Sequence, residues 1–257
     1  MYMHAFTNKI IVTLTVFAII LTSGCRENNE NGTLSLSTTL SWHGEEFAIG
    51  DTVIDYLNRS VRPEKLSCYV SNISLRSIDG EWINSSSISR LDFIPSSSNA
   101  IGEFSSRRLH CSDKFNAIKF NVGVPSELNQ GIDPTSYPNN HPLSFAGSVG
   151  MRWDMHNSYF FVKFEGKVAD EDGGPILTPF IFHCATDPLY RTIVIETNEF
   201  AFHTNDDVEY QLDLDLGLAL EGNSGNIDLT QVGHSMGEVS KAIMLMDNLT
   251  TSWNLKE

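Results

Sequence analysis

The sequence is poor in basic residues and in the short motifs that mark common enzyme classes. Lysine and arginine number 17 against 32 aspartates and glutamates, a formal net charge of −15. Nucleic-acid-binding surfaces are basic, so this balance argues against a nucleic-acid partner. The chain contains no GxSxG, HExxH, Walker, GxGxxG or CxxC pattern. Hydrolase and nucleotide-binding functions therefore lack their usual support in the sequence.

Long apolar runs are scarce, and the one at residues 10–21 (IIVTLTVFAIIL) is too short for a comfortable membrane span. With Lys9 before it and small residues after it, residues 1–24 are predicted to be a secretory signal peptide. LTSGC at residues 21–25 resembles a bacterial lipobox, in which the cysteine, here Cys25, is lipidated; ordinary signal cleavage is the alternative. Residues 25–32 are then the lipidated cysteine and a polar tether. We expect a lipid-anchored protein of the cell envelope, at the outer membrane facing the periplasm or at the cell surface.

Cysteines are few, four in all. Export permits disulfides. Cys68 lies in a strand-like segment and Cys111 precedes another, so we predict a Cys68–Cys111 bridge. Cys184 directly follows His183, where a thiolate would suit a soft metal, although a buried free cysteine is the commoner case.

Period-two alternation or short β-branched runs recur along the chain, separated by turn signals, which predicts β-strands. These segments are residues 34–42, 65–75, 88–94, 115–124, 159–164, 179–183, 192–196 and 209–216. The pattern predicts an all-β fold, an antiparallel β-sandwich or a barrel-like domain, as a single domain over residues 33–257. One segment has helical spacing and predicts a C-terminal helix with an apolar stripe of Val239, Ala242, Ile243, Met246 and Leu249.

Residues 120–166 hold a long loop between two strand-like ends. A connection of this length inside a compact domain is uncommon unless it is functional or disordered, and its proline and aromatic content argues against disorder. Trp153 lies in this loop with Met151 and Met155 on either side. The physics of the residues favours a core tryptophan packed by methionine; thioether ligation of Cu(I) is the alternative.

Histidines are the remaining candidates for chemistry. Imidazole is a common ligand for copper and zinc, and ligands from distant strands can converge in a fold. Any one histidine taken alone is more often a surface residue or a hydrogen-bonded core residue. The histidines beyond the signal are His43, His110, His141, His156, His183, His203 and His234.

A series of short segments resembles the MbnP-like copper-binding family, over nearly the whole mature chain. In order, they are SWHGEEFAIGD, CYVSNISLRSIDG, FNVGVPSELNQGIDP, NNHPL, GMRW followed by YFFVKFEG, FHCAT, and IDL with GHS before the last helix. Members of that family are secreted or lipid-anchored β proteins, and characterised relatives bind copper. In some, a tryptophan is oxidised to kynurenine by a partner di-haem enzyme of the peroxidase type.

The resemblance implies a copper-binding protein that is not an enzyme and that captures, stores or transfers the metal. Trp153 would be the tryptophan that is oxidised, with Trp42 as the alternative, and the long loop would bring Trp153 and one histidine beside the other ligands. His110, His156 and His203 fall outside the family-like segments. The implied copper ligands are His43, His141, His183 and His234.

Two other functions remain open. One is a surface β-sandwich that binds a carbohydrate or a protein without a metal, with the long loop as its recognition surface. The other is an envelope hydrolase that uses carboxylates of the acidic loop at residues 170–174, which requires a fixed separation of two carboxylates across a cleft.

Overall fold

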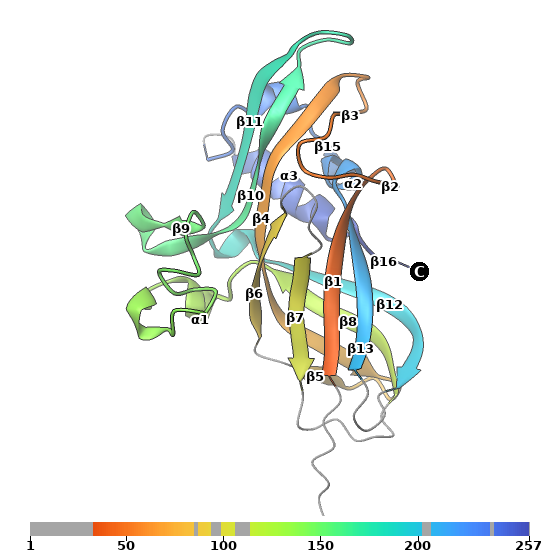
Figure 1. Ribbon diagram of the computed structural model, residues 1–257, viewed down its shortest axis with the longest axis vertical. Helices are drawn as coiled ribbons and strands as arrows, with labels where there is room; N and C mark the ends of the chain where they lie inside the picture. Colours follow the sequence, from red (N-terminus) through yellow and green to blue (C-terminus); the bar gives the residue numbers. More distant parts are fainter. Residues whose placement is uncertain are drawn as a thin grey trace, which may run out of the picture.

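The computed structural model describes residues 33–84, 87–93, 99–105, 114–201, 207–236 and 239–256. These residues form two large β-sheets, one small hairpin and few helices (Figure 1). Each predicted β segment overlaps a strand, so the all-β prediction is confirmed. Within the described residues neither large sheet closes on itself, so the sandwich alternative holds and the barrel alternative does not.

The smaller of the two large sheets is built around β1 (Thr33–Trp42). This strand pairs with β13 (Asp207–Asp215), β7 (Asn99–Ser105) and β2 (Glu45–Glu46), and β16 (Trp253–Leu255) extends the sheet beyond β13. The β1–β13 pairing is parallel, unlike the antiparallel arrangement that we predicted. Parallel strands require a long crossover, and nearly the whole domain lies between these two strands in the sequence.

The larger sheet has the order β11–β10–β4–β8–β12. Its strands are β11 (Ile176–Ala185), β10 (Ser158–Ala169), β4 (Ser60–Ser77), β8 (Lys114–Val122) and β12 (Arg191–Ala201). Shorter strands pair along its length, namely β3 (Val53–Ile54), β5 (Trp82–Asn84) and β6 (Ile88–Phe93) with β4, and β9 (Arg152–Trp153) with β10. β4 changes register with β8 beside Asn72, whose φ of 53° is a conformation that asparagine tolerates.

The core lies between the two sheets and beneath the C-terminal helix. Phe120 of β8 packs edge-to-face on Trp253 of β16, with ring centroids 5.1 Å apart. The helix α3 (Val239–Leu249) confirms the predicted C-terminal helix, but its buried stripe is Ala242, Leu245, Met246 and Leu249. Val239 and Ile243 are 57% and 42% exposed. The predicted stripe was therefore wrong at these two positions, because the helix is rotated toward Leu245.

Short elements complete the described chain. They are α1 (Ser126–Asn129), α2 (Leu216–Leu220), the hairpin β14 (Glu221–Gly222) with β15 (Gly225–Asn226), and 3-10 turns at Pro134–Ser136, Asp154–His156, Asp187–Leu189 and Leu229–Gln231. None of the helices in the described residues is long and apolar enough to cross a membrane.

The long loop is anchored to the larger sheet by tyrosine hydroxyls. Tyr69 donates to the carbonyl oxygen of Pro142 at 3.1 Å, and Tyr159 donates to that of Leu143 at 2.7 Å. Leu143 and Met151 are fully buried. The loop between β8 and β10 is thus a packed part of the domain, on the side of the molecule where β9 and α1 lie (Figure 1).

Candidate functional site

The structure brings His183 and His234 together at the edge of the larger sheet. β11 is an edge strand, and the segment before α3 lies along it. The amide of Ile181 donates to the carbonyl of Gly233 at 2.9 Å, and the amide of Ser235 donates back to Ile181 at 2.8 Å. The backbone at His234 therefore forms a parallel bridge with Ile181 of β11. The ring of His234 packs edge-to-face on that of His183, with centroids 4.8 Å apart.

A carboxylate from β10 orients His183. Residues 163 and 165 point to the same face of β10, and Lys163 is the cross-strand partner of His183. His183 Nε2 lies 2.8 Å from Glu165 Oε1. The ammonium groups of Lys163 and Lys65 lie 3.4 Å and 3.9 Å from the same carboxylate oxygen. Glu165 is thus shared between one imidazole and two cations.

The electrostatics favour a neutral His183 beside an ionised Glu165. Burial lowers the pKa of His183 and outweighs the opposite effect of the Glu165 hydrogen bond. Burial alone would raise the pKa of Glu165, but the His183 hydrogen bond and the charges of Lys65 and Lys163 hold it below its ordinary value. An ionised carboxylate can only accept, so Nε2 of the neutral imidazole carries the proton. The lone pair of His183 is then on Nδ1, the nitrogen left for a metal.

Trp153 is linked to the histidine pair by a row of aromatic rings. β9 pairs antiparallel with β10, with Trp153 opposite Ser158. The indole stacks on Phe160 with centroids 5.7 Å apart, and Phe160 lies 5.0 Å from the ring of His183. The indole also contacts the ring of His156, with centroids 3.8 Å apart. Trp153 is half-buried and packs against the core.

The predicted surroundings of Trp153 are correct for one methionine and wrong for the other. Met151 is fully buried, as the core interpretation requires, whereas Met155 is 85% exposed. Met155 follows Trp153 in a 3-10 turn, Asp154–His156, which turns its side chain to solvent while it returns His156 to the indole.

His43 lies in a separate environment. It occupies the turn between β1 and β2 with φ of 52°. The carboxylate of Asp215 accepts from the amides of His43 and Gly44 at 3.0 Å and 2.8 Å, which fixes the turn. The imidazole Nε2 of His43 lies 3.2 Å from Glu221 Oε1, and its side chain is 42% exposed. Its partner is therefore the hairpin β14–β15, not β11.

His141 is held within the long loop itself. Its ring stacks on that of Tyr137 with centroids 4.2 Å apart and an angle of 6° between the planes. Its Nδ1 accepts from the amide of Leu143 at 3.1 Å. Partial burial lowers the pKa of His141. These contacts give His141 a structural role in shaping the loop.

The predicted convergence of four histidines is not formed. In the described residues, which include all four, no group of three or more His, Cys, Asp or Glu side chains lies close enough to hold a metal ion. His183 and His234 meet because backbone pairing at the edge of β11 places them together. His43 instead pairs with Glu221 of β14, and His141 contacts groups of its own loop.

Three residues of this site were not predicted from the sequence. Glu165 was overlooked, although its alternation with Lys163 on β10 was a usable signal. Phe160 was treated only as part of a strand. His156 was set aside because it falls outside the family-like segments, yet its spacing of three from Trp153 suits the 3-10 turn that joins them.

The cysteine predictions lie partly outside the described residues. Cys25 and Cys111 are not among them, so lipidation and the Cys68–Cys111 pairing stay predictions. Cys68 and Cys184 are buried, and within the described residues they form no disulfide with each other. Burial raises the pKa of each thiol to about 12. Cys184 is therefore an inert core thiol, the commoner of the two alternatives.

Comparison with known proteins gives one family and one similar structure. A family model described as MbnP matches residues 31–241. Among solved structures, MbnP from Methylosinus trichosporium is similar, with a TM-score of 0.52 and 14% sequence identity over 78% of this chain and 80% of that chain. At this identity the likeness shows a common fold alone. No curated protein matches the sequence.

Proposed function

Because its match to the family model covers residues 31–241, the chain belongs to the MbnP family, and from that premise we propose that it binds copper as its cargo at the His183–His234 pair. The observation that carries the proposal is the edge-to-face contact of these two imidazoles, 4.8 Å apart. Imidazole nitrogen is a favoured ligand of copper.

His183 fits a copper ligand in its charge and orientation. Its lowered pKa keeps the ring neutral near pH 7, which is the form that coordinates metals. Its hydrogen bond to Glu165 fixes the ring and leaves Nδ1 free. Histidine ligands are usually held in this way by a carboxylate or a carbonyl group.

His234 is held in a form that metal binding must change. Its Nδ1 accepts from the amide of Met236 at 3.2 Å. Ligation through Nδ1 would use the same lone pair, and ligation through Nε2 would move the ring proton to Nδ1. Either way the Met236 amide loses its acceptor. Copper binding is therefore expected to shift the amide signal of Met236 in an NMR spectrum.

Trp153 is the proposed site of oxidation to kynurenine by a partner di-haem enzyme. Tryptophan itself offers only an N–H donor. Oxidation to kynurenine opens the indole ring, and the product carries an aniline amine and a ketone. The row of rings from Trp153 through Phe160 to His183 supports this choice, because a single ring separates the indole from His183.

The test is a titration of the purified protein with Cu(I) and Cu(II). We expect tight, roughly stoichiometric binding that is lost in His183→Ala and His234→Ala. His43→Ala and His141→Ala are the matched controls and retain it. Circular dichroism checks that all four variants fold. Absence of tight binding, or binding that survives both His183→Ala and His234→Ala, overturns the proposal.

Oxidation is tested on protein from its native cells. Mass spectrometry of the peptide that contains Trp153 should show a net gain of one oxygen and a loss of one carbon, the composition change from tryptophan to kynurenine. An unmodified peptide refutes the partner enzyme and leaves copper binding by histidine standing.

The remaining parts of the proposal concern where the protein is located in the cell and how it acts on copper. A lipid on Cys25, with residues 26–32 as tether, would hold the domain at the envelope membrane, where a copper carrier meets incoming metal. The protein would act there by binding and transfer, not by catalysis. Incorporation of labelled fatty acid that disappears in Cys25→Ala supports the anchor, and equal incorporation in that variant contradicts it.

A further inference from the structure

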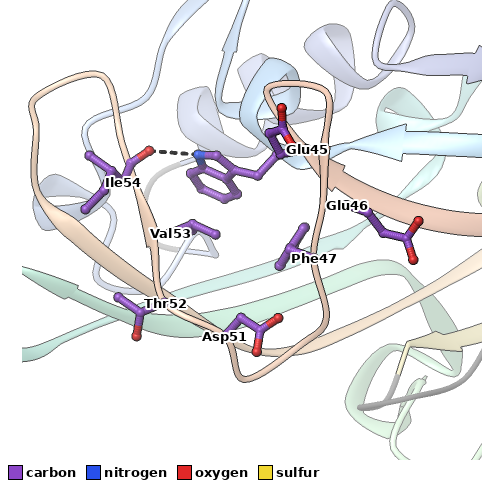
Figure 2. Close-up of a pocket in the computed structure, with 8 residues that line it drawn as sticks. Glu45, Glu46, Phe47, Asp51, Thr52, Val53 and Ile54 are labelled. Carbon is purple, nitrogen blue, oxygen red and sulfur yellow. Dashed lines mark hydrogen bonds between the residues drawn. The ribbon is translucent and has the colours of Figure 1, made fainter.

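A pocket of about 520 Å³ opens beside the loop that joins β2 to β3, on elements that carry neither histidine of the pair (Figure 2). Trp42 forms an aromatic wall with Phe47, edge-to-face with centroids 6.0 Å apart. The indole N–H donates to the carbonyl of Ile54 at 2.8 Å, the dashed line in Figure 2. This bond uses the only polar group of the indole, and Trp42 is 5% exposed, so a small carbon edge of its ring borders the pocket.

Three carboxylates line the pocket, and none of its lining residues is basic. Glu46 is already paired with Lys256 at 2.8 Å, and Figure 2 shows its carboxylate directed away from Val53. Glu45 and Asp51 lie at opposite ends of the loop with Val53 between them (Figure 2). Asp51 uses Oδ2 to accept from the amide of Ala48 at 2.9 Å, which fixes its position. The pocket is thus apolar at its wall and negative at two ends.

This chemistry excludes several ligands. Phosphate and anionic lipid headgroups would be repelled by the carboxylates. A bare metal ion is unsupported, because Glu46 is already paired with Lys256 and Asp51 is bonded to the amide of Ala48. A cationic head on an apolar stem satisfies both features, since the stem packs on Trp42 and Phe47 while the head reaches Glu45 or Asp51. Lysine and arginine side chains have this form.

Exposed apolar side chains adjoin the pocket and indicate a macromolecule. Ile54, Tyr56 and Leu57 are 48%, 37% and 45% exposed. A free amine would leave them in water, whereas a protein surface would cover them. We propose that this pocket receives a lysine or arginine side chain of a partner protein, whose apolar neighbours cover the turn at residues 54–57.

The experiment follows the indole N–H signal of Trp42 by NMR in the purified protein. The probes are the blocked amino acids N-acetyl-lysine and N-acetyl-arginine methylamide, the uncharged N-acetyl-norleucine methylamide, and a blocked Leu-Lys-Leu peptide. We expect saturable shifts with the lysine and arginine probes, with a Kd on the order of 1 mM. Leu-Lys-Leu should bind more tightly than the lysine probe, and Leu57→Ser should remove that gain.

Two variants test the charge. The double variant Glu45→Gln with Asp51→Asn should raise Kd about fivefold, the upper end of an exposed ion pair. Asparagine keeps an oxygen for the Ala48 amide, so the loop is retained. Glu46→Gln is the matched control and should leave Kd unchanged, because Glu46 is engaged by Lys256.

Several results would overturn the proposal. They are an equal response to norleucine, a Kd indifferent to the double variant, or no saturable shift at all. If Leu-Lys-Leu binds no better than the lysine probe, or if its advantage survives Leu57→Ser, the pocket takes free amines and the partner protein is rejected. None of these results bears on copper binding by the histidine pair.

Discussion

Replacing Glu165 tests how the sheet prepares His183 for copper. The carboxylate accepts from His183 Nε2 at 2.8 Å and also balances Lys163 and Lys65. Glu165→Gln keeps an oxygen that can accept the hydrogen bond but removes the charge. Glu165→Ala removes both. The two variants therefore separate the orientation of the imidazole from its electrostatic support.

The expected magnitudes follow from this difference. Loss of a partner that orients a metal ligand typically lowers metal affinity about 10- to 100-fold, or about 1.4 to 2.8 kcal/mol. Glu165→Gln should lie near the lower figure, because the ring stays oriented while two ammonium groups are left unbalanced near the incoming cation. Glu165→Ala should lie near the upper figure.

The assay is a competition for Cu(I) against a chromophoric chelator, with Glu64→Gln as the matched control. Glu64 lies on the neighbouring strand and pairs with Arg62 at 2.9 Å and Lys167 at 3.8 Å, and it has no histidine partner among the described residues. Its replacement should leave copper affinity unchanged. If Glu165→Ala binds copper as tightly as the unaltered protein, His183 is not a ligand oriented by Glu165 and the argument fails.

Four further predictions concern stability and pH. Arg59→Ala should lower the free energy of unfolding by about 3 kcal/mol, because it leaves the carboxylate of Asp55, 3% exposed, without its ion pair at 2.8 Å; chemical denaturation measures this. Gly123→Ala should cost about 2 kcal/mol in the same assay, because an added Cβ would lie 2.7 Å from the Phe161 ring at a φ of +123°. His183 has a pKa lowered from 6.5, so copper affinity should be flat down to about that pH and fall only below it. The folded state also binds fewer protons than the unfolded chain there, so acidification through that window should reduce stability.

Each of these predictions has a control. Arg62→Ala should cost less than about 1 kcal/mol, because its ion pair is solvent-exposed. Gly131→Ala meets no atom within 4 Å and tests the positive φ without a clash. Equal losses for Arg59→Ala and Arg62→Ala would refute the ion-pair argument. Equal losses for Gly123→Ala and Gly131→Ala would refute the packing argument. A copper affinity that already falls between about pH 8 and pH 7 would contradict the neutral His183.

The sequence identified the strands through short apolar and β-branched runs that turn signals separate. The runs at residues 65–75 and 115–124 coincide with β4 and β8, although most positions of both strands are buried and do not alternate with exposed ones. It did not reveal the parallel pairing of β1 with β13, since alternation is the same in either direction. It also left the rotation of α3 undetermined, so that Val239 and Ile243 were placed on the wrong face.

The β class, the terminal helix, the acidic charge and the family-like segments that hold His183, His234 and Trp153 can all be read from the sequence alone. These are local properties, set by periodicity and residue type. Which histidines meet depends on how the strands and the segment before α3 pack together. His234 reaches His183 through backbone hydrogen bonds at the open edge of β11, and an unpaired edge accepts a segment from any point in the sequence. His43 is bound instead by Glu221, which is distant in the sequence, and His141 is bound by its own loop. The periodic pattern of the sequence records neither contact.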